Sequence, residues 1–190
     1  MLGDTQGWLV RLSIMRARLQ SGFTLIEMMI ALVIVALLAL LAAPMYGDMI
    51  ANTEVRNATE NILTGLRTAQ AEAIRLNAPA KLVLDTNGWQ VMVTDPDTND
   101  FDVTPWREYK FAEGAKRASV TPTPTAATDV VFNGLGQMLH QDTAISQVDV
   151  TTSSISNPHP LRILIGTKNV AAGMKMCDPA FSSTDPVGCP

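Results

Sequence analysis

The chain has 190 residues, of which 47% are hydrophobic and 17% are charged, and its formal net charge is −4 at pH 7. This balance provides no global attraction to nucleic acid or to anionic lipid, so any such binding has to be local. One membrane segment and its helical continuation leave roughly 110 residues, which is enough for one small domain but not for two.

The first 22 residues form a short basic leader that contains Arg11, Arg16 and Arg18. Under the positive-inside rule, these arginines keep the leader on the cytoplasmic side of a membrane. Met15 is a second candidate for the start of translation, besides Met1, and it would give a leader of more usual length.

Residues 23–47 form an apolar run with about 20 apolar positions, long enough to cross a bilayer as a helix. One ionisable side chain, Glu27, lies near its start. A charged carboxylate in hydrocarbon costs about 2.5 to 3.5 kcal/mol even on lenient scales, so it ordinarily has a dedicated partner. No Lys, Arg or His lies between Gly22 and Asp48, so the partner has to come from elsewhere.

Cleavage after Gly22 would create such a partner. Phe23 would then carry a free α-amino group, and Glu27 would lie four residues on, one turn along the same helix face. Two alternatives stay open. A cleaved secretory signal requires a purely apolar core and a suitable exit, whereas this core contains Glu27 and Pro44 follows the small residues. An uncleaved signal anchor leaves Glu27 unpaired.

The stretch Gly22-Phe23-Thr24-Leu25-Ile26-Glu27, between the basic leader and an apolar helix with Pro44, resembles the class III signal of type IV pilins and type II secretion pseudopilins. The resemblance implies that a prepilin peptidase cuts after Gly22 and methylates Phe23, so that residues 1–22 are absent from the mature protein. It also implies that Glu27 pairs with the terminal amine of a neighbouring subunit during assembly. Pro44 is expected to bend the helix, since proline removes a backbone hydrogen bond.

Residues 48–78 are predicted to continue as an amphipathic helix. Its apolar positions recur at steps of three and four and form one stripe: Val55, Ala58, Ile62, Leu66, Ala69, Ala73 and Leu76. Its charged residues fall largely outside the stripe: Glu54, Arg56, Glu60, Arg67, Glu72 and Arg75. Pro79 ends the pattern because it disfavours helical geometry at Ala78. One helix from Phe23 to Asn77 would be about 80 Å long; two helices with a break near Gly47 are the alternative.

Residues 79–190 are predicted to form a β-rich head. Short strands are expected at 80–84, 89–93, 107–111, 118–121, 130–132, 147–151 and 161–165. Asn87-Gly88 indicates a hairpin, and the Thr, Pro and Ala-rich residues 121–128 indicate a loop. The fold class is therefore α+β, with the long N-terminal helix packed on an antiparallel sheet or a β-sandwich-like head.

The helix end at 69–79, together with residues 131–136 and 161–165, is similar to the pseudopilin H and FimT group of minor pilins. The resemblance implies the type IV pilin fold, with 23–47 as the transmembrane half of the helix, 48–78 as its amphipathic half, and a periplasmic head. Head function does not transfer with the fold, because such heads diverge widely.

Two cysteines, Cys177 and Cys189, lie near the C-terminus. An oxidising periplasm favours a disulfide between them, worth roughly 3 kcal/mol on the chain-entropy model. Two free thiols are the alternative. His140 and His159 lie at no ligand-like spacing to the cysteines, so no metal site is predicted.

Catalytic and cofactor signals are absent from the sequence: it contains no Gly-x-Ser-x-Gly elbow, His-Glu-x-x-His motif, phosphate loop or dinucleotide fingerprint. We therefore expect neither an enzyme nor a cofactor. The acids Asp95, Asp97, Asp100 and Asp102 suggest a calcium loop. They lack the glycine and terminal glutamate of an EF-hand, and an exposed acidic loop explains them equally well.

DNA binding is a more specific alternative for the function of the head. Some FimT-like minor pilins are associated with DNA uptake through a basic Gly-Arg-x-Arg-x-Cys-like stretch, and residues 173–177 resemble it at the glycine and the cysteine. Both arginines are missing. Lys168 and Lys175 alone would neutralise about two phosphates, a weak and salt-sensitive contact, so nucleic acid is not expected as a partner.

The sequence is thus interpreted as a minor pilin or pseudopilin, anchored by one helix in a bacterial inner membrane with its head in the periplasm. Its expected partners are other pilins or pseudopilins, the prepilin peptidase, the inner-membrane assembly platform and, before assembly, the lipid bilayer. Whether the filament belongs to a secretion system or a pilus stays open, and a signal-anchored periplasmic enzyme or binding protein is the competing class.

Overall fold

The computed structural model describes residues 22–190 except 96, 99, 103, 140–143 and 167–172. The chain divides into two compact units, one ending at Leu41 and the other comprising Ala42–Pro190. A single helix, α1 (Leu25–Leu76), contributes to both. The alternative of two helices with a break near Gly47 is therefore wrong.

The helix α1 begins at Leu25 rather than at Phe23, and it ends at Leu76, before the predicted bounds at Asn77 and 78. Asn77 has φ 50°, in the left-handed region, and the N–H of Ala78 donates to the carbonyl of Ala73 at 3.2 Å. Asparagine tolerates this conformation better than most residues because its short side chain bonds locally. The chain thus turns away from the helix before Pro79, and the first strand begins at Ala80.

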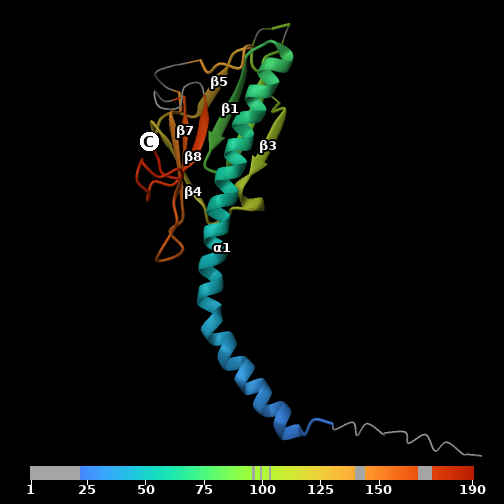
Figure 1. The fold of residues 1–190 in the computed structure, drawn as a ribbon. Helices are drawn as coiled ribbons and strands as arrows, with labels where there is room; N and C mark the ends of the chain where they lie inside the picture. Colours follow the sequence, from blue (N-terminus) through green and yellow to red (C-terminus); the bar gives the residue numbers. More distant parts are fainter. Residues whose placement is uncertain (1–21, 96, 99, 103, 140–143, 167–172) are drawn as a thin grey trace, which may run out of the picture. The chain divides into compact units, whose positions relative to one another are not determined.

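The β-rich unit contains two four-stranded antiparallel sheets within its described residues (Figure 1). The first has the order β3-β2-β1-β5 and is formed by β1 (Ala80–Asp85), β2 (Gly88–Val93), β3 (Arg107–Lys110) and β5 (Asp129–Phe132). The second has the order β4-β6-β7-β8 and is formed by β4 (Ser119–Thr123), β6 (Gln147–Thr151), β7 (Leu161–Ile165) and β8 (Met174–Cys177). A 3-10 turn, η1 (Phe111–Glu113), follows β3.

Three strand predictions need correction. The loop expected at 121–128 begins too early, because β4 continues through Pro122 to Thr123. Proline is tolerated there because β4 lies at the edge of its sheet. On its outer side no neighbouring strand needs a backbone N–H from Pro122. The strand predicted at 107–111 ends at Lys110, where η1 takes over. The strand β8 was not predicted, since Met-Lys-Met-Cys carries no β-branched or aromatic residue.

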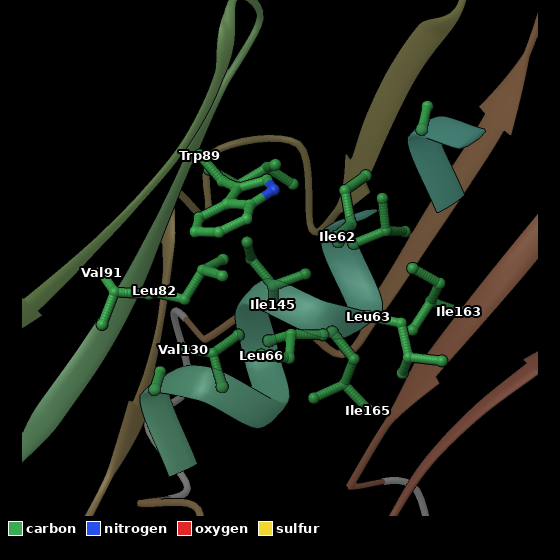
Figure 2. Close-up of a cluster of buried hydrophobic side chains, with 14 of the residues drawn as sticks. Ile62, Leu63, Leu66, Leu82, Trp89, Val91, Val130, Ile145, Ile163 and Ile165 are labelled. Atoms are coloured by element: carbon green, nitrogen blue, oxygen red, sulfur yellow. The ribbon is translucent and has the colours of Figure 1, made fainter. Parts of the chain in front are cut away.

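The hydrophobic core lies between α1 and both sheets (Figure 2). Ile62, Leu63 and Leu66 of α1 lie among side chains of both sheets, and six of the seven predicted stripe residues are fully buried. Leu76, the seventh, is 39% exposed at the helix end. The predicted α+β class, a long helix packed on antiparallel sheets, is confirmed.

Gly65 allows α1 to approach the first sheet closely. A Cβ atom at this position would lie 2.7 Å from Leu82 Cδ1 and 2.8 Å from Trp89 Cδ2. The indole of Trp89 therefore occupies the space that a side chain at position 65 would need. Trp89 also stacks on Tyr109 of the next strand, with the ring centroids 6.1 Å apart.

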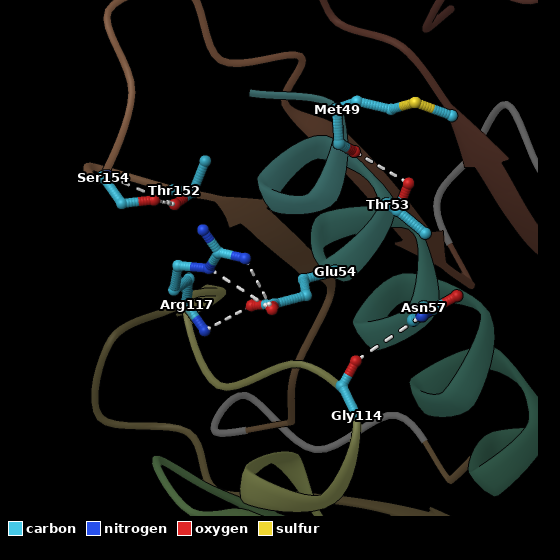
Figure 3. A network of polar contacts seen from close by, with 8 residues as sticks. All are labelled: Met49, Thr53, Glu54, Asn57, Gly114, Arg117, Thr152 and Ser154. Carbon is cyan, nitrogen blue, oxygen red and sulfur yellow. Dashed lines mark hydrogen bonds and ion pairs between the residues drawn. The ribbon is translucent and has the colours of Figure 1, made fainter. Parts of the chain in front are cut away.

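Two charged residues placed outside the apolar stripe are less exposed than that position suggests: Glu72 is buried and Glu54 is partly buried. Glu72 is 8% exposed and pairs with Arg75 at 2.7 Å. The carboxylate of Glu54 accepts hydrogen bonds from the backbone N–H of Arg117 at 2.7 Å and from its guanidinium at 3.1 Å (Figure 3). Buried charges require such partners, and here the partners lie nearby on the helix or on a distant loop.

The Arg117 contact changes the protonation of Glu54. Burial by itself raises the pKa of this carboxyl, but the hydrogen bonds from Arg117 and the charges of Arg117 and Lys116 outweigh it. The pKa of Glu54 is therefore held below its usual value of 4.5. A carboxyl group whose pKa is lower in the folded state than in the unfolded state stabilises the fold at pH values above the unfolded-state pKa. This stabilisation is lost as the pH falls through the folded-state pKa.

We expect Glu54→Gln to destabilise the β-rich unit by about 1 to 2 kcal/mol at neutral pH, since it weakens charge-assisted hydrogen bonds. The difference from the wild type should shrink as the pH falls below 4.5, where the wild-type carboxylate also becomes protonated. Denaturant midpoints at neutral and acidic pH measure this. Glu60→Gln is the matched control, because its ion pair with Arg56 is exposed. A Glu54→Gln deficit that persists unchanged in acid would contradict the assignment.

Candidate functional site

The N-terminal segment of α1 starts from a capped helix turn. Residues 22–24 are not helical, and the hydroxyl of Thr24 accepts the backbone N–H of Glu27 at 3.2 Å. The carbonyl of Thr24 accepts the N–H of Met28, also at 3.2 Å. Thr24 is thus the N-cap. Glu27 lies in the first turn, where its negative charge interacts favourably with the positive end of the helix dipole.

The segment Leu25–Ala42 is long and apolar enough to cross a membrane, with a mean hydropathy of 2.9 and none of its length buried. Large apolar side chains are exposed around the whole helix, from Phe23 at 77% to Leu41 at 78%. A soluble surface does not carry an apolar patch of this size without a partner. These side chains therefore need lipid or other apolar helices around them.

Gly22, Phe23 and Glu27 are all exposed at the start of this segment. In the described part of the chain, Glu27 takes part in no ion pair, so its carboxylate is presented to the outside. Pro44 lies within α1. The bend expected at Pro44 stays a prediction.

The C-terminal site residues form a closed segment next to β8. Cys177 and Cys189 are joined by a disulfide, as predicted. The ammonium of Lys175 donates to the carbonyl of Gly188 at 3.3 Å and is partly buried, which leaves it poorly placed as a phosphate contact. Lys168, the other DNA-contact candidate, lies outside the described residues.

The acidic loop uses its carboxylates for local turns. Asp95 accepts the N–H of Asp97, and Asp100 accepts the N–H of Phe101, each at 2.8 Å. No group of three His, Cys, Asp or Glu side chains suited to a metal ion occurs among the described residues. His159 lies in a loop, and its backbone N–H donates to Oδ1 of Asn52. His140 lies outside the described residues.

Sequence reasoning missed the role of Thr24. The signal was present, since Thr-x-x-Glu directly before an apolar run is the spacing of a capping box.

Two known protein families match parts of this chain. Residues 17–43, which include Gly22 to Glu27, match the prokaryotic N-terminal methylation motif. Residues 58–167, more than half of the chain, match the type II transport protein GspH. The chain belongs to the GspH family. The members of this family are structural pilin-like subunits.

Individual relatives of the GspH-family chain are similar over parts of their length. Two fimbrial proteins of Pseudomonas aeruginosa are 46% identical over 55 residues, which are 29% of this chain and 35% of each relative. The chain thus matches about a third of the length of these curated relatives.

Solved structures with a similar arrangement have low sequence identity to the chain. The minor pilin FimU of Pseudomonas aeruginosa has a TM-score of 0.43 at 14% identity, covering 72% of this chain and 96% of FimU. The minor pseudopilin EpsH of the Vibrio cholerae type 2 secretion system has a TM-score of 0.44 at 11% identity, covering 67% of this chain and 99% of EpsH. GspH of E. coli has a TM-score of 0.42 at 16% identity, covering 68% of this chain and 91% of that structure.

Proposed function

We propose that this GspH-family chain is a minor pilin or pseudopilin that assembles into a type II secretion pseudopilus or a type IV pilus, and so contributes to protein secretion or pilus biogenesis. One observation carries the proposal: the exposed apolar segment Leu25–Ala42 carries a carboxylate, Glu27, in its first turn, within a stretch that matches the methylation motif. Such a helix end suits intermolecular packing.

Processing is the first step of the proposed function. Gly22 lies before the helix and is exposed among the described residues, which supports access by a peptidase. Cleavage after Gly22 by the prepilin peptidase would leave Phe23 as the mature terminus, and methylation of its amine would keep the positive charge. The mature chain would then carry a cation at Phe23, just before the helix, and an anion at Glu27 in the first turn of α1.

Before assembly, the bilayer covers the apolar segment. Leu25–Ala42 would span the bacterial inner membrane, with the β-rich unit in the periplasm. The disulfide between Cys177 and Cys189 supports this placement, because disulfides persist in oxidising compartments. An inner-membrane assembly platform would then transfer the subunit into the filament.

Assembly exchanges lipid for neighbouring helices. The carboxylate of Glu27 has no cation in its own helix segment, and the Phe23 amine of a neighbour would supply one. Pairing two charges in a low-dielectric setting fixes the register of one subunit against the next, since either charge left alone is costly. Apolar packing of the exposed helix would provide the rest of the contact.

We expect Glu27→Leu to insert normally and to lose assembly. The change makes the segment more apolar, which favours insertion, but it leaves the neighbour's amine unpaired. Removing one partner of a buried pair typically costs about 3 to 5 kcal/mol. Crosslinking of this subunit to its pilin neighbours in membranes measures the loss, with cleavage after Gly22 followed in parallel.

Met28→Leu is the matched control, because Met28 is an adjacent, half-exposed and uncharged position of the same helix turn. It should crosslink like the wild type. Undiminished crosslinking of Glu27→Leu would reject the pairing role. Loss of cleavage in Glu27→Leu would instead place the carboxylate in peptidase recognition.

A further inference from the structure

A small pocket, called the α1-end pocket below, opens beside the last turn of α1. Its volume is about 230 Å³. Four apolar and two charged residues are part of its lining: Leu76, Ala78, Val93, Trp106, Arg75 and Asp102. The helix stops at Leu76, and β3 begins only at Arg107, opposite Val91, so neither element continues over the end of β2. Leu76 and Trp106 therefore remain 39% and 45% exposed.

The two charged residues of the pocket differ in their partners. The guanidinium of Arg75 pairs with the carboxylate of Glu72 at 2.7 Å. Asp95 and Asp100, on the same loop as Asp102, accept local backbone N–H groups. The carboxylate of Asp102 belongs to a partly buried residue and takes part in no ion pair within the described ranges. A carboxylate beside apolar side chains loses part of its hydration, so a cation entering the pocket would be bound favourably.

The surroundings of the pocket also favour a cation. Residues 95–102 contain four aspartates. Two cations lie nearby, and each is held on an aromatic ring: Lys81 Nζ lies 4.3 Å from the ring centroid of Phe101, and the guanidinium of Arg107 lies 5.4 Å from that of Trp106. The acids therefore outnumber these cations, and the local field is negative. An apolar group that carries a positive charge beside it complements this pocket.

The size of the pocket decides where such a group comes from. A volume of about 230 Å³ accommodates one large side chain. One side chain buries far less surface than the roughly 1,200 Å² that a stable interface between free proteins needs. Subunits already packed through their apolar helices meet at a high effective concentration, where a single added contact is sufficient. The occupant is thus expected on a subunit of the same filament.

A second copy of this chain does not supply the required group. In the described part of the chain, three exposed large apolar residues adjoin a cation in the sequence: Ile74 and Leu76 flank Arg75, and Trp106 precedes Arg107. Leu76, Trp106 and Arg75 line the pocket itself, and Ile74 lies directly before them on α1. A copy could present them only by giving up its own pocket. The occupant therefore has a different sequence.

We propose that the α1-end pocket accepts a large apolar side chain that adjoins a lysine or arginine on a different pilin subunit of the same filament, and that this cation pairs with Asp102. The inference rests on the filament role proposed above and adds the chemistry of one contact between heads. Leu76 and Trp106 would contact the apolar side chain, and Asp102 would select segments with the positive charge.

The first test places a photoreactive diazirine residue at position 76 of the full-length chain, in membranes that contain the other pilins of the same machine. Irradiation should produce an adduct with another pilin, and mass spectrometry should map it to a segment in which lysine or arginine adjoins a large apolar residue. Asp102→Asn should lower the adduct about fivefold, the ratio that corresponds to about 1 kcal/mol for a favourable ion pair.

Asp97→Asn is the matched control, because Asp97 has the same charge on the same loop but is exposed and does not line the pocket. Its adduct should equal that of the wild type. Equal losses in the two variants would reduce the effect to the general charge of the loop and overturn the inference. An adduct only with a copy of this chain, or only with a protein outside the filament, would also overturn it.

A second measurement needs no filament. Outside the leader, the chain has two tryptophans, Trp89 and Trp106. In the mature chain in micelles, N-acetyl-Lys-Phe-amide should shift the indole N–H resonance of Trp106 and leave that of buried Trp89 unchanged. N-acetyl-Glu-Phe-amide should shift it much less, and Asp102→Asn should remove the difference between the two dipeptides. Equal shifts in the wild type, or no shift with either dipeptide, would overturn the inference.

Failure of the inference is distinguishable from failure of the proposed function. If this chain crosslinks to pilins through its apolar helix but not from position 76, and Trp106 does not respond to the lysine dipeptide, the filament role stands and only the pocket is rejected. If no pilin crosslinks to any part of the chain and residues 1–22 stay attached, the proposed function itself is wrong.

Discussion

Phe132→Ala is expected to destabilise the β-rich unit by about 3 to 5 kcal/mol, because the change removes a large buried side chain and leaves a cavity. Phe132 is fully buried at the end of β5, opposite Ala80 of β1, and it belongs to the core shared by the helix and the sheets. Close neighbours on several elements limit how far the site can collapse around the cavity, which keeps the cost high.

Denaturant unfolding of the mature chain in detergent, followed by tryptophan fluorescence, measures the effect through the midpoint. Phe181→Ala is the matched control, since Phe181 is the same residue type but 52% exposed, and it should stay within about 0.5 kcal/mol of the wild type. Similar losses for the two variants would show that Phe132 does not lie in the core as described.

Replacing both cysteines by serine should cost about 3 kcal/mol, because the disulfide between Cys177 and Cys189 restricts the unfolded chain. The bridge links residues 12 apart and joins the end of β8 to the chain terminus. Cys177 is 2% exposed, so its serine variant also places a hydroxyl in a buried position. The double variant is thus expected to unfold at clearly lower denaturant concentration.

A reductant supplies the control for this experiment. It should lower the wild-type midpoint towards that of the double-serine variant and leave the variant itself unchanged. Thiol titration of the denatured, unreduced wild type should find no free thiol, and two thiols per chain would reject the bridge.

Several features could be predicted from the sequence because they depend on neighbours along the chain. The stripe from Val55 to Ala73 follows from steps of three and four, and it is buried as predicted. The β6 and β7 bounds agree with the prediction, since β-branched residues and flanking turn residues mark them locally. The N-terminal motif needed only the spacing between Gly22, Phe23 and Glu27.

Other features were decided only by contacts between distant residues. Glu54 is held by Arg117, 63 positions away, which donates to its carboxylate, and Gly65 is required because Trp89 lies against it. The strand β8 forms on the edge of β7 although its own residues have little preference for a strand. Helical period and turn chemistry act over a few residues, so the sequence by itself determined the long helix, most of the strands and the N-terminal motif. The choice of partners, which ordered the strands into two sheets, paired Glu54 with Arg117 and buried Glu72, depends on packing energies that exist only once the chain has folded.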